Sequence, residues 1–264
     1  MRAGCLMPLA VRHKQQPREL CQIMPEFQLS SRNHLHALVW LAFPLVMLAT
    51  IYLSRYFYLP FYLEWVEGEH GAIENLTALF LLPTILLGIL LLTHRDKFPR
   101  PYIAIWFLLH GLGALYFAGE EISWGQHFFG WATPEAVDAL NDQGETNLHN
   151  MTSWLDQKPR LLLVFWAVIG GLILPLLHRL NYLAIGGRDD WRYWIIPPAA
   201  CMPAAIIVML VRLPEEIAYA FDRVVLFPFD VRSSEVQELY LALFLSVYLI
   251  SVYRRAKAAP VFNR

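Results

Sequence analysis

Cysteine is scarce in this sequence of 264 residues, which contains only three. Cys5 and Cys21 lie near the start of the chain, and Cys201 lies within a long apolar run. The charged connectors between the apolar runs therefore contain no thiol, which excludes disulfides and thiolate metal ligands from them. We expect the three cysteines to be structural or incidental.

The N-terminal segment lacks an apolar stretch followed by small residues at a cleavage site, and a secretory signal peptide needs both. Residues 1–35 instead contain several basic side chains. This composition predicts a cytoplasmic basic tail, and the first long apolar run would then act as an uncleaved insertion signal.

Charged residues are almost absent from six apolar runs, in a chain in which 57 % of the residues are hydrophobic. A helix needs ~20 mainly apolar residues to cross a bilayer, and the runs approach that length. Any one of them would also suit a buried helix of a soluble protein. Together they predict an all-α fold, a polytopic membrane helix bundle over residues 36–255, with a cytoplasmic tail at 256–264. The runs cover about residues 37–54, 73–93, 102–118, 161–177, 194–211 and 239–253.

The formal net charge of −1 conceals an asymmetry between the connectors. Basic residues gather before the first run, between the second and third, between the fourth and fifth, and after the sixth. The other connectors, including the long ones at 119–160 and 212–237, hold most of the acidic residues. Because basic loops stay in the cytoplasm, we expect both termini to be cytoplasmic and the acidic connectors to face outward. An acidic outer face argues against nucleic acid as a partner there.

Both long connectors carry helix signals. Thr133, Pro134 and Glu135 combine a capping hydroxyl, a proline at the first helical position and an acid near the positive end of the helix dipole. They predict a short helix that runs to about Leu140. The connector at 212–237 spaces its apolar residues as in an amphipathic helix that lies in the membrane interface. We expect both connectors to cap the bundle.

The densest group of polar side chains lies at residues 119–127 and 141–150. If the third helix continues through the first segment, Glu120, Ser123 and His127 share a face, because positions three, four and seven apart align. Polar groups gathered at helix ends near lipid tend to satisfy one another, bind an ion or line a wet cavity. The alternative is a solvated acidic face, which is the simpler interpretation of most acids in the outer connectors.

Glu145 and His149 have the same helical spacing in the second segment. Two facing pairs could supply four oxygen or nitrogen ligands to a divalent metal such as zinc, iron or manganese. The predicted metal ligands are Glu120, His127, Glu145 and His149. In this hypothesis the catalytic residues are Glu121 as the general base, with Ser123, Gln126 and Asn147 orienting ligands or stabilising developing charge.

Two other groups are candidates. Glu67, His70 and Glu74 lie in the connector between the first two runs, and the Glu-x-x-His spacing resembles that of di-iron helix bundles. His110 lies midway along the third run, where an ionisable residue suggests function. A ring hydrogen-bonded to a neighbouring helix explains His110 equally well.

The segments GEEISWGQ at 119–126 and QGETNLHN at 143–150 resemble a signature of uncharacterised polytopic bacterial membrane proteins. The resemblance covers about 32 residues and is looser over 67–74. It implies a location in the bacterial inner membrane and a multi-pass topology. It implies no activity.

The sequence favours a metal-dependent hydrolase or transferase that acts on a lipid or envelope substrate at the outer leaflet. A cation- or proton-coupled transporter is an alternative, since His110 and an acidic outer rim would suit cations. A non-catalytic assembly partner, docking another envelope protein through the long connectors, is a third hypothesis.

Overall fold

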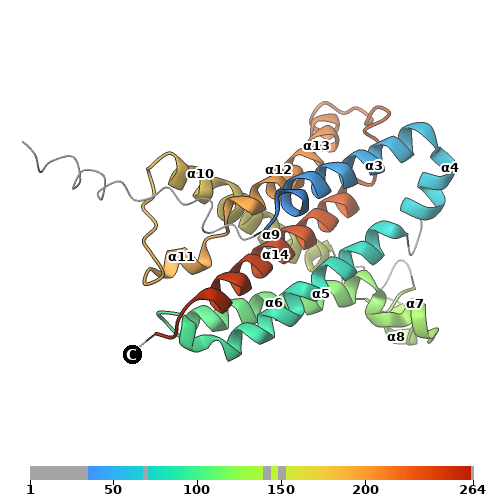
Figure 1. Cartoon of the computed structure of the whole chain (residues 1–264). Coiled ribbons are helices and arrows are strands. Elements are labelled where there is room, and N and C mark those ends of the chain that lie inside the picture. The colour runs from blue at the N-terminus through green and yellow to red at the C-terminus, as the bar shows by residue number, and fades with distance from the viewer. Residues whose placement is uncertain (1–34, 68–70, 139–143, 148–152, 263–264) are drawn as a thin grey trace, which may run out of the picture.

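The computed structural model describes residues 35–67, 71–138, 144–147 and 153–262. Every regular element within these ranges is helical, and six helices are long and apolar enough to span a membrane (Figure 1). The predicted all-α chain with six such helices is therefore confirmed. The six candidate spans are Leu38–Phe57, Ala72–Thr93, Tyr102–Glu121, Lys158–Arg179, Trp191–Ala220 and Ser233–Ala258.

Some of these spans are divided into shorter elements. In chain order the elements are η1 (Leu38–Ala42), α3 (Phe43–Phe57), α4 (Leu59–Phe61), η2 (Tyr62–Val66), α5 (Ala72–Thr93), η3 (Arg95–Lys97), α6 (Tyr102–Glu121), η4 (Ser123–Gly125), α7 (Gln126–Phe129), α8 (Glu135–Asp138), α9 (Ser153–Val168), η6 (Ile169–Ile173), α10 (Leu174–Arg179), α11 (Trp191–Ile195), η7 (Ala199–Cys201), α12 (Met202–Leu210), α13 (Leu213–Ala220) and α14 (Ser233–Ala258).

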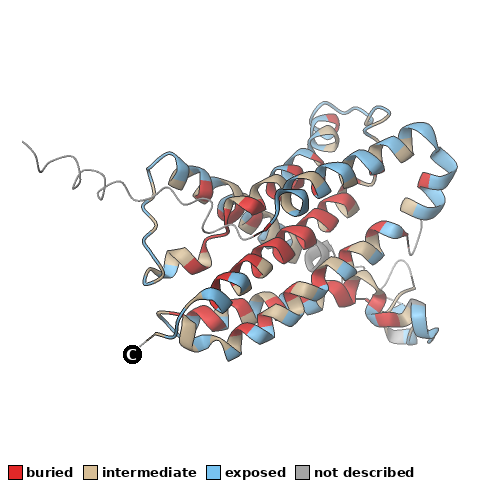
Figure 2. Cartoon of the chain, viewed as in Figure 1, coloured by how far each residue is buried: buried red, intermediate tan, exposed pale blue. Residues whose placement is uncertain are grey.

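The last helix, α14, forms the core of the bundle. It packs against α5, α6, α9 and α12 and is buried along most of its length (Figure 2). Tyr240 of α14 donates a hydrogen bond to the carbonyl of Pro44 in α3 at 2.6 Å, and the hydroxyls of Ser246 and Thr84 lie 3.3 Å apart between α14 and α5. Polar side chains at membrane depth need hydrogen-bonding partners. Because α14 carries such side chains, it lies inside the bundle, where other helices supply the partners.

The fifth span is broken at Pro197 and Pro198. Helix α11 ends at Ile195, and the chain resumes a helical path at η7. The carbonyls in the last turn of a helix lack intrahelical partners. Tyr248 donates to the Ile195 carbonyl and the Arg255 guanidinium donates to the Tyr193 carbonyl, both from α14. The break is thus stabilised by a neighbouring helix, which is how membrane proteins tolerate prolines.

Glycines allow α5 and α6 to approach closely. A Cβ at Gly88 of α5 would lie 2.7 Å from the Cα of Gly111 in α6. Small residues at such a crossing let two backbones pack against each other. This contact fixes the position of α6, which carries several of the candidate site residues.

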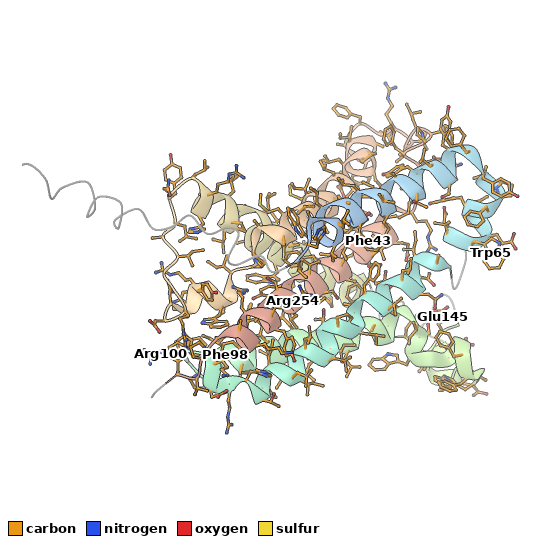
Figure 3. The ribbon with its side chains drawn as sticks, in the orientation of Figure 1. Phe43, Trp65, Phe98, Arg100, Glu145 and Arg254 are labelled. Atoms are coloured by element: carbon orange, nitrogen blue, oxygen red, sulfur yellow. The ribbon has the colours of Figure 1, made fainter. Side chains whose placement is uncertain are left out.

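The connectors separate into two groups, one at each end of the bundle. At one end, which we call the connector end, Arg232 donates to the Glu67 carbonyl at 3.0 Å. At the other end the amide of Phe262 donates to the carbonyl of Asp96 at 2.9 Å. Figure 3 shows Glu145 and Trp65 at the connector end, far from Arg100. The acidic connectors therefore lie together, as the charge pattern predicted.

Helix α6 ends at Glu121, so the condition under which Glu120, Ser123 and His127 would share one helix face is not met. Ser123, Trp124 and Gly125 follow with φ values of 45°, 55° and 94°, in the left-handed region. Three consecutive residues of this kind end a right-handed helix. The short helix α7 then starts in a new direction, and the expected single face does not form.

The helices predicted in the long connectors are present. Helix α8 begins at Glu135, one residue after the proline that was expected at its first position. It is described to Asp138, so the predicted end near Leu140 lies outside the described residues. Helix α13 covers Leu213–Ala220.

Candidate functional site

The two segments of the signature meet at the connector end. The hydroxyl of Ser123 donates to Oε2 of Glu145 at 2.7 Å. The Asn147 side-chain amide donates to the same carboxylate oxygen at 2.6 Å and lies 3.1 Å from the Ser123 hydroxyl. Ser123 and Asn147 are buried. The structure thus brings three of the predicted site residues into one hydrogen-bonded group.

Gln126 joins the same two segments beside this group. Its Oε1 accepts a hydrogen bond from the amide of Thr146 at 2.6 Å, and its Nε2 donates to the hydroxyl of Thr133 at 2.8 Å. Thr133 in turn donates to the carbonyl of Gly144. Gln126 therefore fastens the folded connector together, a structural task that its position in the sequence did not reveal.

Trp124 folds back over the end of α6. Its indole N–H donates to Oε1 of Glu120 at 2.8 Å, and a Cβ at Gly119 would lie 2.8 Å from its ring. Glu120 is only 4 % exposed. The left-handed turn and Gly119 together allow the ring to lie here. They hold the Glu120 carboxylate in place.

The predicted metal set is only partly within the described structure. His149, like His70 of the third candidate group, lies outside the described residues, and only the backbone of His127 is described. Glu120 and Glu145 have the different partners given above. The four-ligand metal site stays a prediction.

The candidate acids of the first connector lie beside Arg232. Its guanidinium donates to the Glu67 carbonyl and lies 4.0 Å from the Glu74 carboxylate. Burial raises the pKa of Tyr62, and the hydrogen bond between Tyr62 and Glu67 raises it further. Tyr62 is therefore a neutral phenol that helps to fix this connector.

Glu121 lies in a different group from Ser123 and Glu145. One carboxylate oxygen from each of Glu121, Glu235 and Glu238 lies within 4.8 Å of the others. The sequence did not single out Glu235 or Glu238, because most acids in the outer connectors are most simply interpreted as a solvated face. Glu235 and Glu238 are three residues apart at the start of the last apolar run, so they lie on one helix face. Their connector was also predicted to lie on the same side as Glu121. These two features were the available signal for the group.

Two arginines accompany these carboxylates. Arg160 of α9 lies 3.1 Å from Glu238, and Arg232 lies 3.2 Å from Glu235. Arg232 thus connects the group to Glu74, whereas Arg160 ties α9 to α14. Like charges this close repel strongly where little water is present, so the arginines stabilise the cluster.

A cavity of about 530 Å³ lies between α6 and α9, with α14 contributing its inner wall. This volume is in the ~300–1,000 Å³ range of small-molecule sites. The apolar lining residues are Trp106, Leu109, Gly113, Ala114, Phe117, Pro159, Leu162, Leu163, Phe165, Trp166, Ile169 and Leu245, and Tyr116 also lines the cavity. At the connector end the lining becomes charged, with Glu120, Glu121, Arg160 and Glu238.

The outer edges of this cavity lie on the surface that would face lipid. Leu109 of α6 and Leu162 and Phe165 of α9 are exposed, at 58 %, 70 % and 55 %. Exposed apolar residues on a helix long enough to span a bilayer suit contact with hydrocarbon. The cavity is therefore bordered by residues that would contact lipid chains.

His110 lines the cavity midway along α6. Its Nδ1 lies 2.9 Å from the Trp106 carbonyl, and its ring lies 4.7 Å from that of Trp106, 5.6 Å from Tyr248 and 6.0 Å from Trp166. Within the described part of the chain, the rings that contact His110 are those of two tryptophans and one tyrosine. A transporter that moves cations past His110 would need a continuous polar track there, and these aromatic neighbours do not favour one.

No family model, curated protein or solved structure matches the chain. The functional argument therefore depends on the geometry and chemistry of the site.

Proposed function

We propose that this chain is a multi-pass protein of the bacterial inner membrane that binds a lipid-like molecule between α6 and α9 and acts on its polar end. The observation that carries the proposal is the change in the lining of one cavity. Its walls are apolar over most of its length, and its connector end presents Glu120, Glu121, Arg160 and Glu238. A hydrocarbon chain with a polar head matches such a gradient.

The route of entry follows from the borders of the cavity. Leu109 and Leu162 are exposed on the flanking helices. A lipid chain could therefore move in sideways from the bilayer without crossing a polar surface. By the positive-inside argument the polar end of the cavity faces the extracytoplasmic side.

The proposed chemistry is hydrolysis or group transfer at the polar head, with carboxylates as the acid and base groups. Carboxylates that crowd one another favour states in which one is protonated and another ionised. Glu121 and Glu238 both line the cavity and belong to the crowded group. We assign these two residues to proton transfer.

A cavity-filling variant tests the binding proposal. Gly113 lines the cavity, and a Cβ built there meets no atom within 4 Å. Gly113→Leu should therefore occupy the cavity without disturbing the helix. We expect the purified wild-type protein to retain a lipid that mass spectrometry detects after extraction, and Gly113→Leu to lose it. Gly113→Ala, which adds little volume, is the matched control and should keep the lipid. Equal lipid content in all three proteins would reject the proposal.

The enzyme hypothesis also includes a divalent metal ion at the connector end. It assigns Glu120, His127, Glu145 and His149 as ligands, as the sequence suggested. Metal analysis of the purified protein tests it, comparing wild type with His127→Ala and His149→Ala. We expect a stoichiometric divalent ion in the wild type and its loss in both variants, and a wild type without such an ion would reject the metal-dependent form.

A further inference from the structure

The charges at the polar end of the cavity restrict what can bind there. Among the lining residues that the structure describes, three are acidic, Glu120, Glu121 and Glu238, and one is an arginine, Arg160. Arg160 is already paired with Glu238 at 3.1 Å. With no metal bound, the polar end carries an excess of one negative charge when either Glu121 or Glu238 is protonated, and of two when all four groups are ionised.

We infer that the cavity selects a lipid-like molecule whose polar head carries an amine, and that it discriminates against heads bearing phosphate or sulfate. This inference rests on the proposed function, because it specifies the ligand of the same cavity. An anionic head would lie beside three acidic residues, and like charges held together at a binding surface repel strongly. An ammonium group would instead donate hydrogen bonds to those carboxylates.

A divalent metal ion is the other cation that could offset the excess, but the neighbouring residues favour an amine. Glu235 and Glu238 each lie beside an arginine, at 3.2 Å and 3.1 Å. A guanidinium competes with a metal ion for the same carboxylates and repels the ion. A metal ion also leaves the adjoining apolar volume unexplained, whereas the hydrocarbon tail of an amine would fill it.

Three amphiphiles with one tail length and different heads test the inference: tetradecylamine, tetradecanol and tetradecyl sulfate. Affinity for the purified full-length protein is measured by native mass spectrometry at neutral pH with EDTA. We expect the amine to bind about tenfold or more tightly than the sulfate, with the alcohol between them. The measurement is repeated with Mn²⁺ in place of EDTA. Tighter binding of the sulfate than of the amine under either condition would overturn the inference.

Charge variants give the direction of the effect. Glu121→Gln should lower the ratio of amine to sulfate affinity about tenfold, and Arg160→Gln should raise it. Because the two shifts have opposite signs, partial misfolding cannot produce both. Glu135→Gln, an exposed acid on α8, removes the same charge outside the cavity and should leave the ratio unchanged.

The outcomes also separate this inference from the proposed function. If the three amphiphiles bind with equal affinity and Gly113→Leu abolishes all binding, the cavity is a lipid site without charge selection and only the inference fails. If none of them binds to the wild type, both fail.

Discussion

At the scale of single residues, the connector end is held by polar side chains that satisfy one another. Glu145 accepts hydrogen bonds from Ser123 and Asn147, and Glu120 accepts one from Trp124. Buried polar groups without partners cost free energy, so each acceptor requires a donor at a fixed place. The residue types of the signature are explained by this requirement, independently of any catalytic role.

Trp124→Phe tests the bond to Glu120. The variant keeps an aromatic ring over Gly119 and removes only the indole N–H, so the free energy of unfolding should fall by about 1–3 kcal/mol. Chemical unfolding in a mild detergent measures the change. Trp65→Phe is the control, because Trp65 is 60 % exposed. An equal loss in both variants would show that the hydrogen bond contributes nothing specific.

Asp190, at the opposite end, gives a pH-dependent prediction. Partial burial alone would raise its pKa, but hydrogen bonds from the Arg192 side chain and from the amides of Gly186 and Arg192 outweigh burial and lower it. A carboxylate whose pKa is lower in the folded state stabilises the fold above its unfolded pKa of ~3.9. That stabilisation disappears as the pH falls through the folded-state pKa.

Asp190→Asn should therefore lower the melting temperature at pH 7 and make little difference at pH 2. Asp189→Asn, at the neighbouring position, is the control. Thermal unfolding at a series of pH values measures both. A deficit in Asp190→Asn that is unchanged at pH 2 would contradict the assignment.

At the scale of elements, glycine positions determine how closely α6 approaches its neighbours. Gly88 and Gly111 leave no room for a side chain between α5 and α6, whereas Gly113, two residues farther along α6, has open space beside it. The same helix therefore packs tightly on one face and borders the cavity on another.

A pair of alanine substitutions tests this difference. Gly88→Ala should destabilise the protein by about 1–3 kcal/mol, because its Cβ would meet the α6 backbone at 2.7 Å. Gly113→Ala should be neutral or stabilising by up to ~1 kcal/mol, since alanine favours the helix and meets no atom. Unfolding midpoints of the two variants provide the comparison. Equal effects would mean that the close crossing does not exist.

The end of α6 shows where sequence patterns stop being informative. Apolar runs predicted all six long helices, because crossing a bilayer requires length and hydrophobicity. The turn at Ser123, Trp124 and Gly125 was not predictable, since two of these residues adopt the left-handed conformation without being glycine. That conformation depends on the tertiary contact between Trp124 and Gly119.

At the scale of the whole molecule, charge pattern predicted which connectors lie together but not which side chains meet. The acidic connectors share one end, as expected. The proximity of Glu121 to Glu235 and Glu238, and the cavity beside them, depend on how α6 and α9 pack around α14. Such packing between distant segments leaves no periodic trace in the sequence.

The most direct test of the lipid-binding account is a high-resolution structure of the protein in nanodiscs made with lipids of its host membrane. The account predicts elongated density between α6 and α9, with its polar end within hydrogen-bonding distance of Glu121, Glu238 or Arg160. A cavity closed by the side chains of those helices, or one that contains only water, would contradict it.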